Sequence, residues 1–267
     1  TSLCQLYFYQ IYFVYLSRIY NLAVLEYSLK SFRMIIISFF TKILHYLPGE
    51  LSHSIALRGL ELLNYSGLIR LFHFTKKYDF TERDVRHRKN MLGIAAGLDK
   101  NGEYIDSLAS LGLGFIEVGT VTPKPQTGNP KPRIFRNKKE KSLLNRLGFN
   151  NKGVDYLVEK LKKRKSKIIV GSSIGKNFDT PNDKAHEDYI LCLEKVYEFS
   201  DYIAVNISSP NTKDLRALSS KDSFDFLLKK LKDSHTKLST RFGYKPIFIK
   251  ISPDENQENL KLICQSI

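Results

Sequence analysis

A short polar segment, Asn-Ile-Ser-Ser-Pro-Asn-Thr at 206–212, directly follows the apolar run Tyr-Ile-Ala-Val at 202–205. The apolar run predicts a buried strand, so two amides, two Ser hydroxyls and a Thr would leave the end of one strand together. Pro210 restricts the backbone there. Such a set of donors and acceptors could bind a small polar ligand. The same residue types also form ordinary turns, and this segment alone does not decide between the two.

Comparable clusters follow other predicted strands. Small residues at 95–97 allow a flat ligand to approach the backbone, and Lys100 supplies a cation there, although a tight turn would need the same small residues. Lys250 lies within an otherwise apolar run, where a lysine normally requires a partner charge or a ligand. Further polar clusters occupy 119–123 and 145–151.

Nucleotide-binding motifs are incomplete in this chain. The segment 171–177, Gly-Ser-Ser-Ile-Gly-Lys-Asn, has three residues between its glycines where a P-loop has four, and Asn177 stands where a P-loop has Ser or Thr. Gly112-Leu-Gly114 precedes a predicted strand, whereas a dinucleotide fingerprint follows one. Neither a nucleoside triphosphate site nor a dinucleotide site is predicted.

The elements that would hold these clusters alternate between strand and helix after residue 90. Apolar runs predict strands at 92–96, 115–119, 168–174, 202–206 and 246–251, and amphipathic patterns predict helices at 151–163, 182–199 and 222–237. This alternation predicts a parallel sheet. Polar residues that follow the strands indicate either a (β/α) barrel or a doubly wound sheet.

The N-terminal region has a different composition. Residues 1–33 are rich in Leu, Tyr, Phe and Ile, begin with Thr and contain no Gly or Pro, so we expect a non-native or disordered apolar leader before Met34. A transmembrane helix at 6–25 is the competing interpretation, but Gln10 and Arg18 interrupt it. Residues 34–75 predict two short amphipathic helices broken at Pro48, which form either a protein-packed cap or an interfacial membrane element.

The composition limits the partners. Lys and Arg number 42 against 27 Asp and Glu, a net charge of +15 that favours phosphates, carboxylates, acidic lipids or nucleic acid. The basic runs at 136–141 and 162–167 fall in a loop-like segment and at a helix end without a nucleic-acid motif, so we predict no nucleic-acid binding. Three distant cysteines argue against a disulfide framework, and six scattered histidines predict no metal site.

Taken in order, these clusters resemble the dihydroorotate dehydrogenase family, specifically its membrane-associated, quinone-using class 2. The resemblance runs from about Leu47 to the end and is carried by AAGLDKNGE (95–103), EVGTVTPKPQTGNPKPRIFR (117–136), NRLGFNNKGVD (145–155), IGKNFDTP (174–181), NISSPNT (206–212) and IKISPD (249–254). It implies FMN at the mouth of a (β/α)8 barrel and oxidation of dihydroorotate to orotate in pyrimidine synthesis, with ubiquinone or menaquinone as electron acceptor.

The resemblance also assigns roles to residues. Ser209 matches the catalytic base, at a position where class 1 relatives carry Cys, and would need a water or hydroxyl relay such as Thr212 because serine is a weak base. Arg136 matches an arginine near the quinone end of the tunnel. The matched flavin contacts are Ala96, Gly97, Leu98, Asp99, Lys100, Thr120, Ser173, Asn206 and Lys250. The matched substrate contacts are Lys100, Asn145, Arg146, Leu147, Gly148, Phe149, Asn206 and Asn211.

Two departures from the family pattern affect these expectations. Ser173 stands where the family usually has an Asn that contacts FMN. The sequence stops at Ile267 after the fifth predicted strand, so residues 76–267 are expected to form about five of the eight strands of a barrel, without its phosphate cradle, and the polypeptide is expected to be inactive. A partial or frameshifted reading of a gene would explain the Thr1 start and the abrupt end.

The alternatives are a class 1-like or dihydropyrimidine-oxidising flavoprotein, which Ser209 and the helical cap disfavour, and a non-catalytic basic fragment that binds membrane or nucleic acid. The resemblance implies that the helices at 34–75 are a membrane-docking cap through which quinone enters, and hence peripheral membrane association. Without an Arg-rich, Ser-rich leader, we expect the cytoplasmic side of a bacterial inner membrane before the mitochondrial inner membrane. A monomer is expected.

Overall fold

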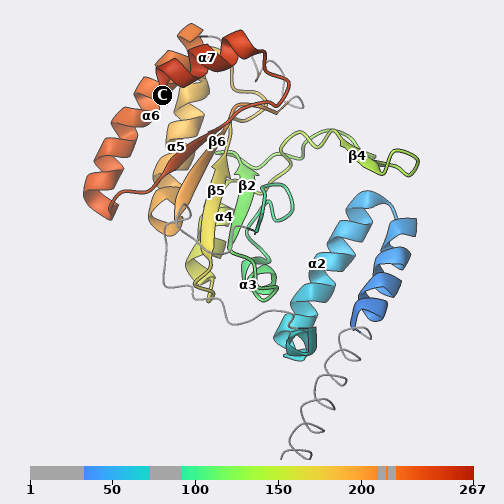
Figure 1. Ribbon diagram of the computed structural model, residues 1–267. Coiled ribbons are helices and arrows are strands. Elements are labelled where there is room, and N and C mark those ends of the chain that lie inside the picture. The colour runs from blue at the N-terminus through green and yellow to red at the C-terminus, as the bar shows by residue number, and fades with distance from the viewer. Residues whose placement is uncertain (1–32, 73–91, 210–214, 216–220) are drawn as a thin grey trace, which may run out of the picture. The chain divides into compact units, whose positions relative to one another are not determined.

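The computed structural model describes residues 33–72, 92–209, 215 and 221–267 (Figure 1). The chain divides into two compact units, 1–56 and 57–267, each of which is described by itself. The division falls inside helix α2, Gly49–Tyr65, which follows helical residues 33–46 and precedes the short helix η1, Leu68–Phe72. The expected domain boundary at 75/76 and all but the last residue of the expected leader lie outside the described residues.

The two N-terminal helices have the separation that Pro48 predicts. Helical residues 33–46 end before Pro48, because proline cannot continue the hydrogen-bond ladder of the preceding turn. Within this unit the Ser52 hydroxyl donates to the carbonyl of Leu44 and links the second helix to the end of the first. Many large apolar side chains stay exposed, among them Met34, Ile35, Phe39, Phe40 and Ile43.

The larger unit contains a parallel five-stranded sheet in the order β1-β2-β5-β6-β7, within the part of the chain that the structure describes. Its strands are β1 (Gly93–Ile94), β2 (Phe115–Val121), β5 (Ile169–Ile174), β6 (Tyr202–Asn206) and β7 (Ile247–Lys250). The predicted α/β class, with parallel strands and intervening helices, is confirmed.

The helices alternate with these strands along the chain. They are α3 (Ile105–Ala109), α4 (Val154–Lys163), α5 (Ala185–Val196) between η3 (Asn182–Lys184) and η4 (Tyr197–Phe199), α6 (Lys221–Phe242) and α7 (Gln257–Ser266). The helix predicted at 151–163 begins only at Val154, because Gly153 adopts a φ of 85° and Asn151 is used in side-chain hydrogen bonds. The helix predicted at 222–237 continues to Phe242.

The two faces of the sheet carry different side chains, because successive residues of a strand point to opposite sides. Even-numbered residues of β5, odd-numbered residues of β6 and, in β2, Ile116 and Val118 form the outer face, where Ile116, Val170 and Ile203 are fully buried in one core with α4, α5 and α6. The register of β2 shifts between Val118 and Val121, so Val121 joins the outer core and Thr120 lies on the inner face. The inner face holds a smaller cluster of Ile169, Tyr202 and Ala204. We call these the outer and inner faces below.

The sheet is curved toward its inner face. Strands β2 and β7 are separated by β5 and β6, so a flat sheet would place them about 14 Å apart. The Nζ atom of Lys250 on β7 nevertheless lies 3.8 Å from Oε1 of Glu117 on β2. The lengths of the two side chains and the curvature of the sheet together bring them into contact. Curvature of this kind is the geometry of a barrel wall.

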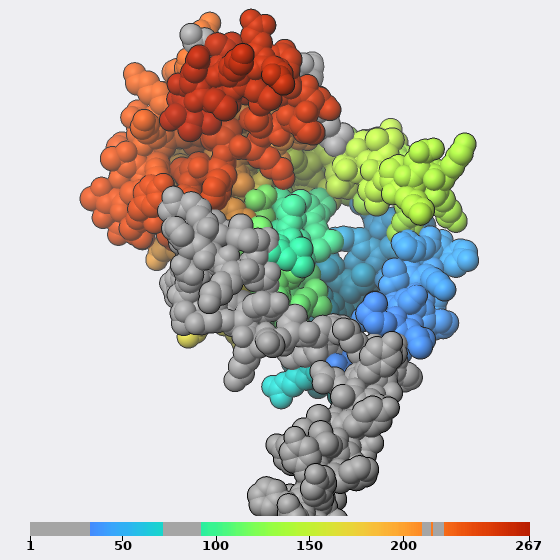
Figure 2. Space-filling model, in the orientation of Figure 1, coloured from blue at the N-terminus to red at the C-terminus, as the bar shows by residue number. Residues whose placement is uncertain are grey.

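One element differs from the prediction. The segment 136–141 was expected to be loop-like, but Ile134–Asn137 and Ser142–Asn145 form an antiparallel hairpin, β3–β4, with Lys138 to Lys141 as its turn. The loop-like prediction is confirmed for the turn at 138–141 and wrong for Arg136 and Asn137, which belong to β3. The two strands were missed because this region is rich in lysine and lacks the apolar alternation of a half-buried strand. Figure 2 shows this hairpin, in yellow-green, at the surface.

Among the helices of the described ranges 33–72, 92–209 and 221–267, none combines the length and the apolar character that crossing a bilayer requires.

Candidate functional site

A cavity of about 490 Å³ lies beside the carboxyl ends of the parallel strands. It is lined by Lys100, Asn145, Ser209 and Lys250, which come from the loop after β1, the end of β4, the loop after β6 and the end of β7. These four positions are up to 150 residues apart in the sequence. The sequence hypothesis required them to share one cavity, and the fold brings them together.

Most of the other predicted site residues also line this cavity. They are Ala96, Gly97, Thr120, Leu147, Gly148, Phe149 and Asn206. Five predicted residues are not part of its lining: Leu98, Asp99, Arg136, Arg146 and Ser173. Asn211, together with the proposed relay Thr212, lies outside the described residues.

Asp99 does not line the cavity; its side chain instead makes structural hydrogen bonds to the backbone. Its buried carboxylate accepts hydrogen bonds from the backbone N–H groups of Glu103, at 2.9 Å, and Tyr104, at 2.7 Å. These bonds fix the turn that leads into α3. Burial raises the pKa of Asp99 above its ordinary value, and the backbone hydrogen bonds only partly oppose that rise. Asp99 thus holds the loop whose next residue, Lys100, faces the cavity.

Lys100 is held by its own loop. Its Nζ donates to the carbonyl of Gly97 at 2.9 Å, which keeps the ammonium at the cavity wall. Gly97 has a φ of 109°, a conformation that disfavours other residues, and a Cβ atom added there would meet no atom within 4 Å. The backbone of this loop is therefore open toward a flat ligand.

A chain of side-chain hydrogen bonds crosses the inner face at the strand ends. The hydroxyls of Thr120 and Ser173 are 2.9 Å apart, and the Nδ2 atom of Asn206 donates to Thr120 Oγ1 at 2.9 Å. The Oδ1 atom of Asn206 accepts from the backbone N–H and the hydroxyl of Ser208, each at 3.1 Å. Ser173 thus supports Thr120 from behind, and Asn206 orients the turn that carries Ser209.

The loop 145–151 is fixed by two amide side chains, one from another loop and one of its own. Gln126 Nε2 donates to the carbonyl of Gly148 at 3.1 Å, and Asn151 Nδ2 donates to the carbonyl of Phe149 at 2.7 Å. Arg146 is directed away from the cavity, because its guanidinium donates to the carbonyl of Pro132. Arg146 does not line the cavity, and its substrate-binding role stays a prediction.

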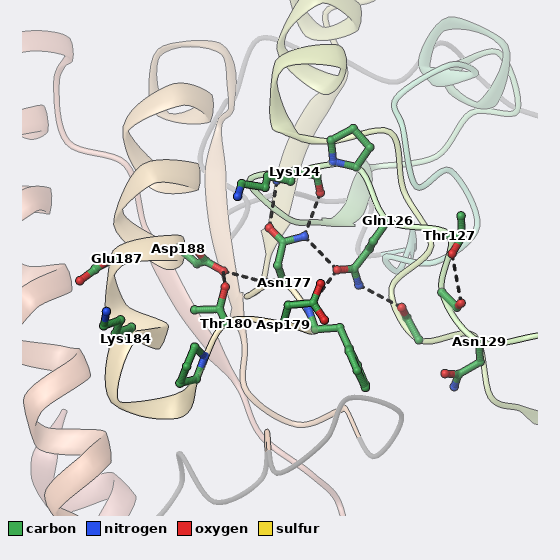
Figure 3. A pocket seen from close by; sticks show the side chains of 15 residues that line it. Lys124, Gln126, Thr127, Asn129, Asn177, Asp179, Thr180, Lys184, Glu187 and Asp188 are labelled. Carbon is green, nitrogen blue, oxygen red and sulfur yellow. Dashed lines mark hydrogen bonds between the residues drawn. The ribbon is translucent and has the colours of Figure 1, made fainter.

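A second cavity, of about 590 Å³, is lined by Gly148 of this loop together with residues 124–129 and 177–181 (Figure 3). At its wall the Asn177 amide donates to Thr122 Oγ1, the Lys124 carbonyl and Gln126 Oε1 at 2.9–3.1 Å. Asp188 accepts from the Thr180 hydroxyl at 2.7 Å. These side chains are satisfied by one another, so they brace the loops of the first cavity and offer few open donors to a ligand.

Six cavity residues had no specific role assigned to them from the sequence. They are Leu143, Leu144, Ser208, Ser252, Pro253 and Asp254. Ser252 to Asp254 follow a predicted strand, and their position after its end was the available signal. Leu143 and Leu144 belong to the unexpected hairpin, so no pattern in the sequence pointed to them.

The donor set fits a flat, electron-rich ligand with an anionic partner. Lys100 and Lys250 are the lysines at its wall, and Thr120, Asn206 and Asn145 add hydroxyl and amide groups. Its volume falls within the range of ordinary small-molecule sites. Within the described residues no group of three or more His, Cys, Asp or Glu side chains is placed to hold a metal ion.

Comparison with known proteins gives one consistent result. The family model for dihydroorotate dehydrogenase matches residues 84–267. A protein of Acinetobacter baylyi named dihydroorotate dehydrogenase (quinone) is 47% identical over 222 residues, which cover 83% of this chain and 66% of that protein. A protein of the same name from Coxiella burnetii is 57% identical over 176 residues, covering 66% of this chain and 51% of its own.

Solved structures agree with the sequence comparison. The crystal structure of DHODH from Eimeria tenella in complex with ferulenol superposes with a TM-score of 0.66 and 34% identity, covering 81% of this chain and 62% of that one. The ligand-free form from the same organism gives a TM-score of 0.63. The chain spans between about half and two thirds of the length of the curated relatives named above.

Proposed function

We propose that this chain, which belongs to the dihydroorotate dehydrogenase family, carries the residues for oxidation of (S)-dihydroorotate to orotate in pyrimidine synthesis, with a quinone as the final electron acceptor. The single observation that supports the proposal most strongly is the shared cavity of Lys100, Asn145, Ser209 and Lys250. It combines a hydroxyl and two cations at the carboxyl ends of parallel strands, where α/β folds bind their ligands, with an amide from the end of the hairpin strand β4.

The family generally depends on a flavin, and FMN is the flavin that we propose for this site. Bound in the cavity, FMN would supply the acceptor for the hydride that leaves C6 of the substrate. The open backbone at Ala96 and Gly97, the hydroxyl of Thr120 and the ammonium of Lys250 fit one edge of its ring. A cation at Lys250 would stabilise negative charge on the reduced ring.

Ser209 is the residue that we propose to remove the proton from C5 of dihydroorotate. Its hydroxyl lines the same cavity as Lys100 and Asn145. The Oγ atom would take the C5 proton and pass it on through a water or a hydroxyl, because an isolated serine is a weak base. The hydrogen bonds of Ser208 to Asn206 fix the turn on which Ser209 is carried, and this lowers the cost of ordering the base.

The carboxylate of the substrate would be bound by cation and amide. The ammonium of Lys100 is held against the carbonyl of Gly97 and lines the cavity in a geometry fixed by its loop. Asn145 lies at the end of β4, where the hairpin passes into the braced loop 145–151. A charged donor beside a neutral amide is the arrangement that distinguishes a carboxylate from a pyrimidine carbonyl.

The quinone and membrane parts of the proposal depend on apolar exposure. Met34, Phe39 and Phe40 in the first unit are each more than half exposed, as a surface that contacts lipid requires. Ubiquinone and menaquinone are both lipids and fit equally. We propose peripheral association with the cytoplasmic side of a bacterial inner membrane. Arg136, on β3, is the residue that we propose for the quinone end of the site.

The test is binding followed by turnover with the purified full chain. Orotate and FMN are titrated first, then dihydroorotate and a short-chain quinone are added and orotate formation is followed by its absorbance. Turnover that Ser209→Ala abolishes would support the whole proposal and contradict the inactivity predicted from the sequence. Binding without turnover, weakened by Lys100→Met, would support the site alone. A chain that binds neither ligand would contradict the proposal.

A further inference from the structure

Glu117 is a carboxylate on the inner face that the proposed chemistry does not use. It lies on β2, two residues before Gly119, and its side chain is 15% exposed. Its Oε1 atom is 3.8 Å from Nζ of Lys250, which lines the cavity. Oε1 is buried and has no hydrogen-bond partner within the described part of the chain. A buried carboxylate oxygen is costly unless a cation or donor approaches it, so Lys250 is the group toward which it is directed.

The other oxygen of Glu117 is held by Tyr202. The Tyr202 hydroxyl donates to Oε2 at 3.3 Å, and burial, together with the nearby Glu117 charge, raises the pKa of Tyr202 well above its ordinary value. The phenol therefore stays protonated and acts as a donor to the carboxylate. The carboxylate has one oxygen fixed by a neutral donor and the other left for the ammonium.

The position of Tyr202 depends on a glycine between the two strands. Glu117, Gly171 and Tyr202 are paired in one row across β2, β5 and β6. A Cβ atom on Gly171 would lie 2.0 Å from the Tyr202 ring, so only glycine lets the ring cross β5 and reach Glu117. Phe115 and Phe248 pack edge-on against the same ring, with centroids 6.5 Å and 5.3 Å away, and restrain it from both sides.

We propose that Glu117, oriented by Tyr202, is a positioning residue that holds the Lys250 ammonium at the wall of the cavity. The inference rests on the proposed function, because its purpose is to present Lys250 to the ring of the flavin. Lys250 carries four methylene groups and is 41% exposed at its side chain, so without a fixed partner its ammonium would sample many rotamers. The Glu117 carboxylate on β2 limits the rotamers that the Lys250 side chain can adopt.

The contact itself is tested without any ligand. The full chain and its Glu117→Gln, Lys250→Met and doubly substituted variants are unfolded in urea. We expect the two substitutions to be non-additive, with a coupling of about threefold in the unfolding equilibrium constant, as for a partly exposed ion pair. Strict additivity would overturn the proposal, whether or not the chain binds flavin.

The positioning role is tested by FMN affinity in the same four proteins. Glu117→Gln is expected to weaken FMN binding about tenfold when Lys250 is present and to have no further effect in the Lys250→Met background. The oxidised ring is neutral, so loss of position outweighs removal of the carboxylate charge. A purely structural Glu117 would weaken binding equally in both backgrounds, and that result would overturn the proposal.

Two further variants guard against misfolding and non-specific charge effects. Tyr202→Phe keeps the ring and removes only the hydroxyl, so a smaller weakening of FMN binding that also depends on Lys250 is expected. Glu103→Gln is the matched control, because Glu103 pairs with Lys152 at 2.7 Å away from the cavity. It should leave FMN affinity unchanged, and an equal effect from this control would contradict the proposal. Failure of the parent chain to bind FMN would contradict the proposed function and the flavin-directed role together, while the urea experiment would still report on the contact.

Discussion

The outer and inner faces of the sheet use the same strands for opposite purposes. On the outer face, Ile116, Val170 and Ile203 are fully buried against helices and form one continuous core. On the inner face, Thr120, Asn206 and Lys250 present polar groups to a cavity. The comparison teaches that alternate residues of one strand serve different ends. Those that point outward stabilise the fold by burial, and those that point inward provide groups for a ligand.

The polar groups of the inner face are ordered mainly by one another. Thr120, Ser173 and Asn206 form a hydrogen-bonded chain, and Glu117 meets Tyr202 and Lys250. On the outer face, order comes from close packing. A cavity wall needs groups that are fixed but still available to a ligand, and hydrogen bonds to one side of a side chain provide this.

Truncation of the outer face should give the largest loss of stability. Ile203→Ala removes a fully buried side chain of β6 and should lower the free energy of unfolding by about 3 kcal/mol, from lost burial and the cavity left behind. Urea unfolding followed by circular dichroism measures this. Lys250→Met on the inner face is the comparison and should change stability by less than about 1 kcal/mol. Equal losses would show that the two faces do not differ as described.

Enlarging a residue under Tyr202 should be the next largest effect. Gly171→Ala places a methyl group against the ring and should cost about 1–3 kcal/mol of stability by overpacking. Gly59→Ala in the middle of α2 is the matched control, since an added Cβ there meets nothing within 4 Å. Because alanine favours helix, that control should be stabilised by about 0.5–1 kcal/mol. A neutral Gly171→Ala would mean that Tyr202 does not need its present position.

Removing a cavity cation should affect binding and spare stability. Lys100→Met should weaken orotate binding at least tenfold, because a charge-assisted hydrogen bond to the carboxylate is lost. Its unfolding free energy should stay within about 1 kcal/mol of the parent. Calorimetric titration gives the first quantity and urea unfolding the second. Unchanged orotate affinity would remove Lys100 from the proposed site.

The pH dependence of stability should report on Asp99. Burial raises the pKa of Asp99 in the folded state, so as pH falls the folded protein binds this proton before the unfolded chain does. Its favourable contribution is full below the pKa of the unfolded state and is lost as pH rises through the folded pKa. The difference in unfolding free energy between the parent and Asp99→Asn should therefore be more favourable to the parent at about pH 4 than at about pH 7. A difference independent of pH would contradict the assignment.

The hairpin should give the smallest effect. Leu144 is 70% exposed, so Leu144→Thr should change the free energy of unfolding by less than about 0.5 kcal/mol, as is usual for surface positions. Threonine also suits a strand. Thermal unfolding measures the change. A larger loss would show that the hairpin is packed in solution, in contrast to its exposure here.

Much of the fold could be predicted because its pattern is local. The run 202–206 was predicted as a strand and is β6 with the same limits, and all five parallel strands were located from apolar runs. The hairpin could not be predicted, since its strands pair with each other at the surface and need no apolar stripe. The helix at 182–199 is one α-helix with a 3-10 turn at each end, a distinction that residue types do not carry.

The site was predictable in its residue types and less so in their directions. Lys100 and Asp99 are adjacent, and both were assigned to the flavin. Lys100 lines the cavity, whereas the Asp99 side chain accepts hydrogen bonds from backbone N–H groups just before α3. Asn145 and Arg146 differ in the same way, because Arg146 finds the carbonyl of Pro132. Neighbouring side chains in a loop diverge according to the partners that the fold offers them.

By itself, the sequence determined the alternation of strands and helices, the polar strand ends and the family to which the chain belongs, because these depend on the order and type of residues along the chain. Only the tertiary structure decided that Glu117 reaches Lys250 and that the Tyr202 hydroxyl donates to the other oxygen of the same carboxylate. Those contacts join strands β2, β6 and β7, and they depend on the curvature of the sheet and on the space above Gly171. Neither the curvature nor that space is determined by any one segment of the sequence.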